Sequence, residues 1–241
     1  MLQINDLSGF VYRCLINVQM LIFDLFFLPY NEKIRTHVNT YLRKPFYETQ
    51  SDDLPMSELD QIITVLKGGG TILYPTDTIW ALGCDATSAK AVEKIRRIKE
   101  FRTKEPMIVL VDSIDMLHRH VIEVHPRIET LISYHQRPLT VMYDRCRYLA
   151  SNVMNEDGAA AIRVTLDPFC RELVSKLGRP LVAYNAQSQE VDSPMGFSDV
   201  DPHILENVDY IVHYKQDQTI EKYPSVIVKL TDRAELDFIR E

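Results

Sequence analysis

The stretch "TILYPTDTIWALGCDAT", from Thr71 to Thr87, decides the fold of this chain. Its first residues, 71–75, are mostly apolar and predict a β-strand. Three short polar side chains follow at 76–78 (Thr-Asp-Thr), and a helix begins only near Thr87 or Ser88, either of which can serve as its N-cap. Polar residues at the carboxyl end of a strand in an open α/β sheet lie in the crevice where ligands bind. The stretch therefore indicates a polar ligand site, or else a strand-to-helix loop in which Thr and Asp only cap backbone groups.

The rest of the chain alternates helical and strand patterns, which predicts a single α/β domain. Helices are predicted to begin at Ser57, at Thr87 or Ser88, at Asp112 or Ser113, near Pro126, and at Asp167. Strands are predicted at 71–75, 107–111, 139–143, 159–166, 180–184, 210–213, 225–230 and 236–239. We expect a twisted open sheet flanked by helices, and we expect it to be mixed because the last two strands are close in sequence.

Size and charge limit the class of protein. With 241 residues, 46% of them apolar, the chain is long enough for one globular domain with a buried core and an appendage. The net charge of −7 gives no global positive field of the kind that favours generic nucleic-acid binding, so any RNA contact would be local. The four cysteines form no Cys-x-x-Cys pair, which predicts reduced thiols in a cytoplasmic protein and no zinc site.

Residues 1–55 are predicted to be an N-terminal appendage of unknown role. They contain the most apolar stretch of the chain, "CLINVQMLIFDLFFLPY", but Asn17, Gln19 and Asp24 interrupt it. Its unbroken apolar runs are shorter than the ~20 residues needed to cross a bilayer, so we expect no membrane span. We interpret the stretch as an amphipathic helix docked on the domain or on a partner. Alternatively, the natural start lies at the beginning of the domain, which we place over 56–241.

The motifs from Tyr74 to Ser113, "YPTDTIWALGCDATSAKAVEKIRRIKEFRTKEPMIVLVDS", resemble those of the YrdC-like threonylcarbamoyl-AMP synthase family. That family carries a P-T-[ED]-T-x-x-x-[LI]-G-x-[DN]-A block, then K-x-R, then an apolar strand. The similarity continues in the family's order through "RPLTVMY", "AAIRV", "RPLVAYNAQ" and "PSVIV". It covers the chain from about residue 56 to the end and none of the first 55 residues.

The resemblance implies an enzyme and a set of substrates. Such an enzyme joins L-threonine, bicarbonate and ATP into threonylcarbamoyl-adenylate and releases pyrophosphate, with Mg²⁺ assisting. Partner proteins of the tRNA-modification machinery then transfer the threonylcarbamoyl group to an adenosine in tRNA. Catalysis of this kind rests on positioning and on cations that meet the negative charge developing at the α-phosphate.

The resemblance also implies a threonine pocket made by Thr78, Arg163 and Ser225. Thr78 falls on the family's substrate-contacting threonine, and Ser225 falls on a small hydroxyl residue that helps to hold the substrate. Arg163 falls on the arginine that clamps the threonine carboxylate. A guanidinium inside a strand is costly unless it is paired, and a carboxylate ligand is a suitable bidentate partner. The alternative is a salt bridge from Arg163 to an Asp or Glu of the chain.

The nucleotide-binding residues implied by the resemblance are Lys99, Arg102, Asn185, Ser193 and Arg240. Catalytic roles are implied for Lys99 and Arg163, and no residue is predicted to ligate a metal directly. ATP is expected as a substrate, together with Mg²⁺.

This nucleotide side departs from the family pattern. Phe101 stands where the family has the arginine of K-x-R, and Arg102 follows one position late. Glu105 replaces a polar residue, Leu110 replaces a histidine, and Asn185 begins "NAQ" in place of S-x-N. A carboxylate near a triphosphate is repelled unless Mg²⁺ lies between them. The alternative function is therefore a non-catalytic paralogue that binds a nucleotide, an amino acid or structured, double-stranded RNA.

Other polar or aromatic features favour structural roles. We expect His118, His120 and His125 to be solvated and not to bind a metal, since the first two diverge around a helix. Trp80 could stack on a base, but we favour core packing. The run "KIRRIK" (94–99) could contact RNA phosphates, although charges on the outer face of a helix are usually only solvated.

Overall fold

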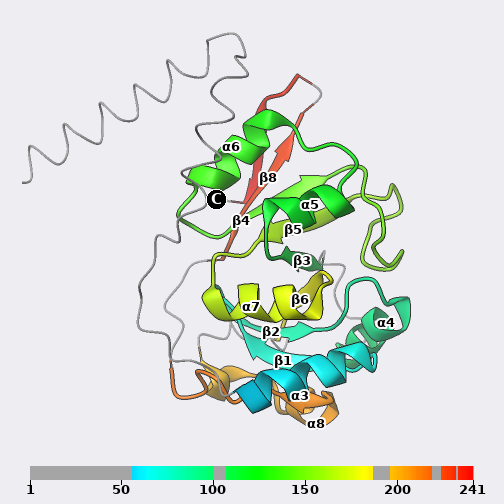
Figure 1. The fold of residues 1–241 in the computed structure, drawn as a ribbon, viewed down its shortest axis with the longest axis vertical. Coiled ribbons are helices and arrows are strands. Elements are labelled where there is room, and N and C mark those ends of the chain that lie inside the picture. Colours follow the sequence, from blue (N-terminus) through cyan, green and yellow to red (C-terminus); the bar gives the residue numbers. More distant parts are fainter. Residues whose placement is uncertain (1–55, 100–106, 187–195, 219–223, 232, 241) are drawn as a thin grey trace, which may run out of the picture. The chain divides into compact units, whose positions relative to one another are not determined.

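The computed structural model describes residues 56–99, 107–186, 196–218, 224–231 and 233–240. The appendage predicted over 1–55 lies outside this part of the chain, so its boundary stays a prediction. The described residues form one mixed sheet with helices packed against it (Figure 1), which confirms the predicted α/β class.

The sheet has nine strands in the order β7-β1-β2-β6-β3-β5-β4-β8-β9. Their bounds are β1 Ile72–Pro75, β2 Trp80–Gly83, β3 Ile108–Val111, β4 Leu139–Tyr143, β5 Ala160–Val164, β6 Leu181–Asn185, β7 Tyr210–Ile211, β8 Val226–Leu230 and β9 Leu236–Arg240. The pairs β1/β7, β3/β5 and β4/β8 are parallel, and the other neighbours are antiparallel. The predicted mixed sheet is therefore confirmed.

Four of the five predicted helices begin at the residues that local signals indicate, and the first begins at Met56, just before the predicted cap Ser57. The helical elements are α3 Met56–Lys67, α4 Ala89–Ile98, α5 Ile114–His120, α6 Pro126–Tyr134, α7 Pro168–Leu177, the 3₁₀ turn η2 Phe197–Asp199 and α8 Pro202–Asn207. Ser88 caps α4 and Ser113 caps α5, each through its side-chain oxygen. Asp167 caps α7, which ends at Gly178 with φ 72°, a left-handed conformation that favours glycine. Helix α7 packs against α3 and β3, and α5 packs against β3 and β5 (Figure 1).

One strand and two short helices were not predicted. β2 occupies part of the stretch that we interpreted as a loop leading to a helix, and it pairs antiparallel with β1. The two strands form a hairpin that is closed by the hydrogen bond from Thr76 N to Ile79 O, 3.1 Å. A residue with no side chain is needed at Gly83, because an added Cβ would lie 2.5 Å from the ring of Tyr74 across the hairpin. The elements η2 and α8 fall in or next to residues 186–203, a polar stretch without a helical pattern.

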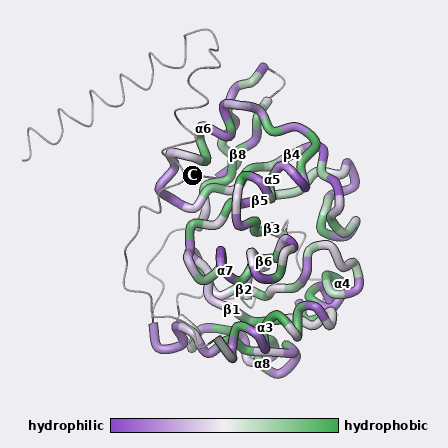
Figure 2. The backbone as a smooth tube through the Cα atoms, viewed as in Figure 1, coloured by the Kyte–Doolittle hydropathy of each residue, from purple (hydrophilic) through white to green (hydrophobic). Residues whose placement is uncertain are grey.

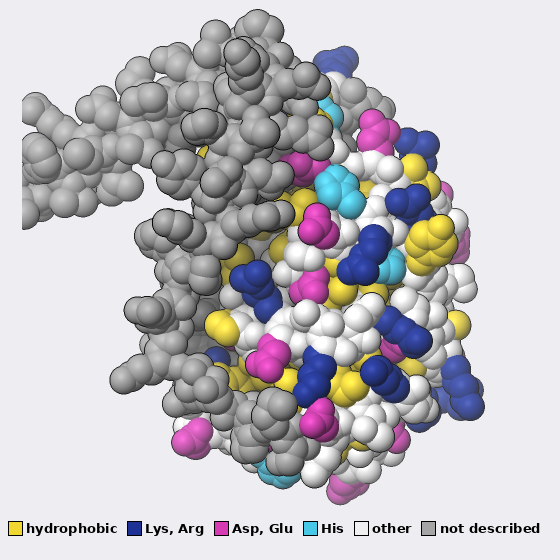
Figure 3. Space-filling model, in the orientation of Figure 1, with side chains coloured by type: hydrophobic (Ala, Val, Ile, Leu, Met, Phe, Trp, Pro, Cys, Tyr) yellow, Lys and Arg dark blue, Asp and Glu magenta, His cyan; other side chains and the backbone are white. Residues whose placement is uncertain are grey.

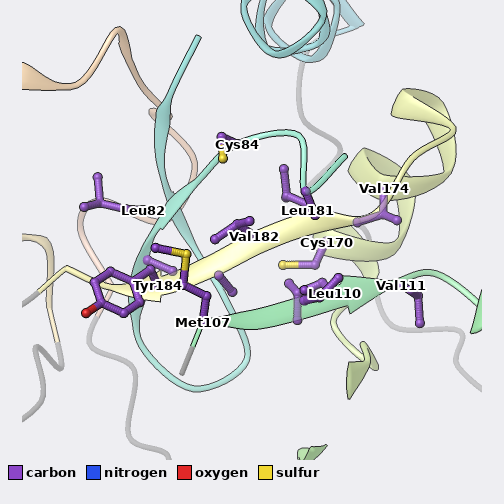
Figure 4. Close-up of a cluster of buried hydrophobic side chains, with 14 of the residues drawn as sticks. Leu82, Cys84, Met107, Leu110, Val111, Cys170, Val174, Leu181, Val182 and Tyr184 are labelled. Atoms are coloured by element: carbon purple, nitrogen blue, oxygen red, sulfur yellow. The ribbon is translucent and has the colours of Figure 1, made fainter. Parts of the chain in front are cut away.

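The apolar residues of the strands and the inner faces of the helices form the core, as the hydropathy colouring of Figure 2 shows. In Figure 4, Leu110 of β3, Leu181 of β6 and Cys170 and Val174 of α7 point toward one another. Trp80 is fully buried and its ring lies 5.0 Å from that of Phe197, which confirms the core interpretation. Among the helices of the described part of the chain, none has the length and apolar character needed to cross a bilayer.

Candidate active site

The turn between β1 and β2 presents buried polar side chains toward the sheet. The hydroxyl of Thr76 accepts hydrogen bonds from the backbone N–H groups of Thr78 and Ile79, both 3.1 Å, and donates to Ile79 O at 2.7 Å. Thr76 thus plays the local capping role that was the alternative for this stretch. The Thr78 hydroxyl also lies 3.1 Å from that of Thr76, and Asp77 and Thr78 make further contacts beyond the turn.

Those contacts are made with Arg163 of β5. The Arg163 guanidinium lies 3.3 Å from Asp77 Oδ1 and 3.4 Å from Thr78 Oγ1. Arg163 is 2% exposed and Asp77 6%. In the sheet, three strands lie between β1 and β5, namely β2, β6 and β3. The contact therefore requires the twisted sheet to carry the hairpin turn back over Arg163.

The salt bridge that we kept as the alternative for Arg163 is therefore present, with Asp77 as its partner. A clamp on a ligand carboxylate remains a prediction for the same guanidinium. The guanidinium faces the turn and not bulk water, as such a clamp requires.

Three buried polar atoms of this pair have no hydrogen-bond partner among the described residues. They are Oδ1 and Oδ2 of Asp77 and Nε of Arg163. Buried polar groups in proteins are nearly always hydrogen-bonded, so a group of exceptions at one place needs an explanation. A bound polar ligand or ordered water would supply the missing partners.

Ser225 lies in a second polar cluster, just before β8. Its Oγ accepts a hydrogen bond from Thr140 Oγ1 at 2.9 Å and another from Arg240 Nη2 at 3.0 Å, and Arg240 Nε also donates to Ser225 O at 2.9 Å. Both lone pairs of the Ser225 hydroxyl are then used, which leaves its O–H as the group that can still donate a hydrogen bond. Ser225 is 2% exposed and is therefore a buried donor directed by its neighbours.

The two clusters are neighbours in the sheet. β4 pairs antiparallel with β5 with Val141 opposite Ile162, so one further step in this register brings Thr140 opposite Arg163. Residues opposite each other on adjacent strands share a face of the sheet. The structure thus brings together the predicted threonine-binding residues, with Thr140 between Arg163 and Ser225.

Two of the predicted nucleotide-binding residues, Lys99 and Asn185, lie near the carboxyl end of β6, where the successive side chains of Tyr184 and Asn185 point to opposite faces of the strand. Lys99 follows α4 and its Nζ lies 5.8 Å from the centroid of the Tyr184 ring. Asn185 is next to Tyr184 and pairs with Ala81 of β2, beside the β1–β2 turn. Arg240 lies apart from this pair, at Ser225. Arg102 and Ser193 lie outside the described residues.

The residues that depart from the family pattern also fall partly inside and partly outside the described residues. Phe101 and Glu105 also lie outside the described residues. Leu110 is fully buried in β3, opposite Leu181 and Arg163 on the neighbouring strands, and belongs to the core. At Leu110 an apolar side chain therefore replaces a polar one beside the guanidinium.

Burial sets the chemistry of two groups that border the site. Burial raises the pKa of Tyr74 well above its usual range, and the Tyr74 hydroxyl donates to Val182 O at 2.9 Å. Burial likewise raises the pKa of the Cys170 thiol well above its usual range, and the thiol contacts Pro75 O. A thiol held in its protonated form is a poor nucleophile, so Cys170 is not a candidate for covalent catalysis.

Two residues of the site were missed from sequence. Asp77 was noted only as a polar residue of the turn, with no role assigned, and Thr140 was not noted at all. The available signal for Thr140 was its place inside the apolar strand "LTVMY", since a fully buried hydroxyl must find a partner.

The histidines and the basic run of α4 have structural contacts. His118 lies 2.9 Å from Glu129, and His125 caps α6. His120 is buried and contacts Arg147 O, so our expectation that it is solvated was wrong. The described residues contain no group of three or more His, Cys, Asp or Glu side chains arranged to hold a metal ion.

In the basic run, Arg96 donates to Asn152 O at 2.7 Å and Lys94 lies 3.5 Å from Asp209. The face of the molecule in Figure 3 shows basic and acidic side chains interspersed over the described surface. These intramolecular contacts and the mixed charge of the surface favour a structural or solvated role for the run over RNA binding.

Comparison with known proteins identifies the family of the chain. A family model described as "Sua5_yciO_yrdC: Telomere recombination" matches residues 64–241. The threonylcarbamoyl-AMP synthase of Xanthomonas euvesicatoria pv. vesicatoria is 30% identical over 162 residues, which cover 64% of this chain and 84% of that protein. The enzyme of the same name from Psychromonas ingrahamii is 23% identical over 157 residues, covering 64% of this chain and 82% of that protein.

Solved structures show the same fold. P. abyssi Sua5 complexed with L-threonine superposes with a TM-score of 0.68 at 20% identity, covering 78% of this chain and 55% of that one. This chain thus spans a little over half the length of that protein. E. coli YciO superposes with a TM-score of 0.65 at 20% identity, covering 79% of this chain and 91% of that one. From the match over 64–241 and the shared fold, we conclude that the chain belongs to the Sua5/YciO/YrdC family.

Proposed function

We propose that this protein is a cytoplasmic, ATP-dependent L-threonylcarbamoyl-adenylate synthase acting in tRNA modification. The observation that carries the proposal is the buried guanidinium of Arg163, which contacts Thr78 and is separated by the single strand β4 from the directed donor Ser225. Relatives named threonylcarbamoyl-AMP synthase and the L-threonine complex of P. abyssi Sua5 support this choice of amino acid.

Threonine would bind through its carboxylate, its amino group and its hydroxyl group. Arg163 offers charged N–H donors to the carboxylate, and the free proton of Ser225 offers a further hydrogen bond from the adjacent cluster. Thr78 lies beside the guanidinium, where its hydroxyl would contact the substrate. Bonds from a charged donor in a buried site are strong, because little water competes for them.

ATP would bind toward the carboxyl end of β6, where Lys99 and Asn185 lie. Lys99 would meet the phosphate charge, and Asn185 would hydrogen-bond the nucleotide. Arg102, Ser193 and Arg240 complete the proposed nucleotide set, with Arg102 in place of the family arginine. Mg²⁺ would reach the site with the triphosphate, which commonly supplies most of its non-water ligands. Because the described residues contain no cluster of metal ligands, we assign Mg²⁺ no protein ligand.

The reaction has three balanced steps. Threonine loses one proton of its ammonium group to water, and the resulting neutral amine combines with bicarbonate to form a carbamate and water. A carbamate oxygen then attacks the α-phosphate and displaces pyrophosphate. Arg163 and Ser225 would fix the amino acid, while Lys99 would stabilise the charge that develops on the phosphate oxygens. The product would pass to partner proteins that modify tRNA.

The second candidate is a paralogue that binds an amino acid, a nucleotide or double-stranded RNA without turnover. Phe101 and Glu105 favour it, since one removes a cation and the other adds a negative charge on the nucleotide side. Under this candidate the threonine pocket is retained and the adenylation chemistry is lost.

Pyrophosphate release tests the proposal. The full chain is incubated with L-threonine, bicarbonate, ATP and Mg²⁺, and release is compared with and without threonine. We expect threonine-dependent release that falls at least tenfold in Arg163→Met. Absence of release where an authentic synthase is active, combined with calorimetric binding of threonine or AMP, would favour the binding module.

A further inference from the structure

We propose that Asp77 is the acceptor for the amino group of the bound amino acid, so that Asp77 and Arg163 together select a zwitterion. This inference rests on the proposed threonine pocket and adds a specificity-determining residue to it. Asp77 occupies the acidic position of the P-T-[ED]-T motif, to which the sequence alone assigned no role.

The first support is the environment of the Asp77 carboxylate. The side chain is 6% exposed, and neither of its oxygens has a hydrogen-bond partner among the residues that the structure describes. Within the same residues, its charged contact is the 3.3 Å approach of Oδ1 to Arg163. A carboxylate offers about four acceptor sites, so most of the bonding capacity of Asp77 is unused in a place from which water is largely excluded.

The second support is that the guanidinium partner is also incompletely bonded. Within the described part of the chain, Nε of Arg163 has no hydrogen-bond partner, and its Nη1 makes the long 3.4 Å bond to Thr78. An α-amino acid carries a carboxylate and an ammonium group on one carbon. Placed at this pair, it would present an acceptor to Arg163 and donors to Asp77 at the same time.

A second Asp–Arg pair, in which Asp85 is buried and the Arg179 side chain is 54% exposed, shows what a structural role of a buried aspartate looks like. Asp85 Oδ2 lies 2.7 Å from Arg179, while its Oδ1 accepts from the backbone and the hydroxyl of Thr87 at 2.8 and 2.6 Å. Both oxygens of Asp85 are therefore bonded. The two Asp77 oxygens accept no hydrogen bond from the described residues, which points to a partner supplied from outside the chain.

The inference predicts selection for the amino group. A ligand with the same carboxylate and hydroxyl but no amine would leave Asp77 without a donor, and truncating one side of a buried charged pair costs on the order of thirtyfold or more in affinity. (R)-3-Hydroxybutanoate is such a ligand, because it is L-threonine without its amino group.

Titration calorimetry of the full chain with L-threonine and with (R)-3-hydroxybutanoate tests the inference. In the natural sequence threonine should bind at least about thirtyfold tighter. Asp77→Asn should reduce this ratio to about threefold or less, because the neutral amide cannot attract the ammonium group. Asp85→Asn is the matched control, since it removes the charge of the fully bonded pair and should leave the ratio unchanged.

Each other outcome counts against the inference. A preserved ratio in Asp77→Asn, with both ligands weakened equally, would mean that Asp77 acts only through the fold. Equal binding of both ligands by the natural protein, or binding of neither, would overturn the inference without any variant, so it does not depend on Asp77→Asn folding.

The result is separable from the proposed function. If the thirtyfold affinity ratio is lost in Asp77→Asn but the natural protein releases no pyrophosphate, Asp77 is the amine acceptor and the synthase is refuted. If pyrophosphate is released but the affinity ratio is unchanged in Asp77→Asn, the synthase stands and the role of Asp77 is refuted.

Discussion

Replacing Arg163 by Met should destabilise the protein strongly, because it leaves the Asp77 carboxylate buried with no counter-charge. Arg163 is 2% exposed and Asp77 is 6% exposed, so solvent screening is weak at both ends of the pair. Removing one partner of a buried ion pair costs about 3–5 kcal/mol. Asp77 has no hydrogen bond that would offset the loss, so we expect a value of about 4 kcal/mol. For a domain of this size that corresponds to a fall in Tm of about 8–16 °C.

The double variant Arg163→Met/Asp77→Asn separates this charge effect from the loss of packing. With both charges removed, the protein should recover most of its stability, because buried pairs replaced as a unit are often neutral or stabilising. Urea unfolding followed by circular dichroism gives the free energy of unfolding for the four proteins of the cycle. We expect a coupling energy of at least about 2 kcal/mol. A cost below about 1 kcal/mol for Arg163→Met, or a double variant no more stable than the single one, would refute the reasoning.

Three further perturbations follow from single contacts. Gly83→Ala should lower the free energy of unfolding by about 1–3 kcal/mol in a urea titration, because its Cβ would lie 2.5 Å from the buried Tyr74 ring; a neutral effect would mean that the hairpin relaxes freely. Thr140→Val should weaken threonine binding about three- to tenfold by releasing Ser225, while Thr140→Ser should restore it, and equal affinities of the two variants in calorimetry would contradict this role. Burial raises the pKa of Cys146 to about 11, so its alkylation by iodoacetamide at pH 8, followed by peptide mass spectrometry, should be about a hundredfold slower than that of a free thiol; labelling at the free-thiol rate would show that the thiol is not held protonated.

The boundaries of the helices could be predicted because their signals are local. Ser88 and Asp167 each cap a helix through their own side chains, and Gly178 ends α7 by adopting a positive φ. Such signals act over three or four residues and do not depend on what the rest of the chain does. The candidate pocket residues Thr78, Arg163 and Ser225 came from a family resemblance, since nothing in their local patterns places them near one another.

β2 was missed because it lies in a short apolar run that follows a turn, and its strand character depends on pairing with β1 and β6. Periodicity alone does not distinguish so short a run from a loop. The absence of a Cβ at Gly83 is likewise explained only by the ring of Tyr74 on the opposite strand.

The sequence by itself determined the α/β class, the capped helices and the polar composition of the β1–β2 turn, because each of these depends on neighbouring residues along the chain. Only the tertiary structure decided that Asp77 meets Arg163 and that Thr140 and Arg240 direct Ser225. These contacts join strands distant in sequence, and they exist because the twisted sheet carries the hairpin turn over the face of β5. The free energy of burying their charges and hydroxyls is therefore set by the curvature of the sheet, a property that no local pattern encodes.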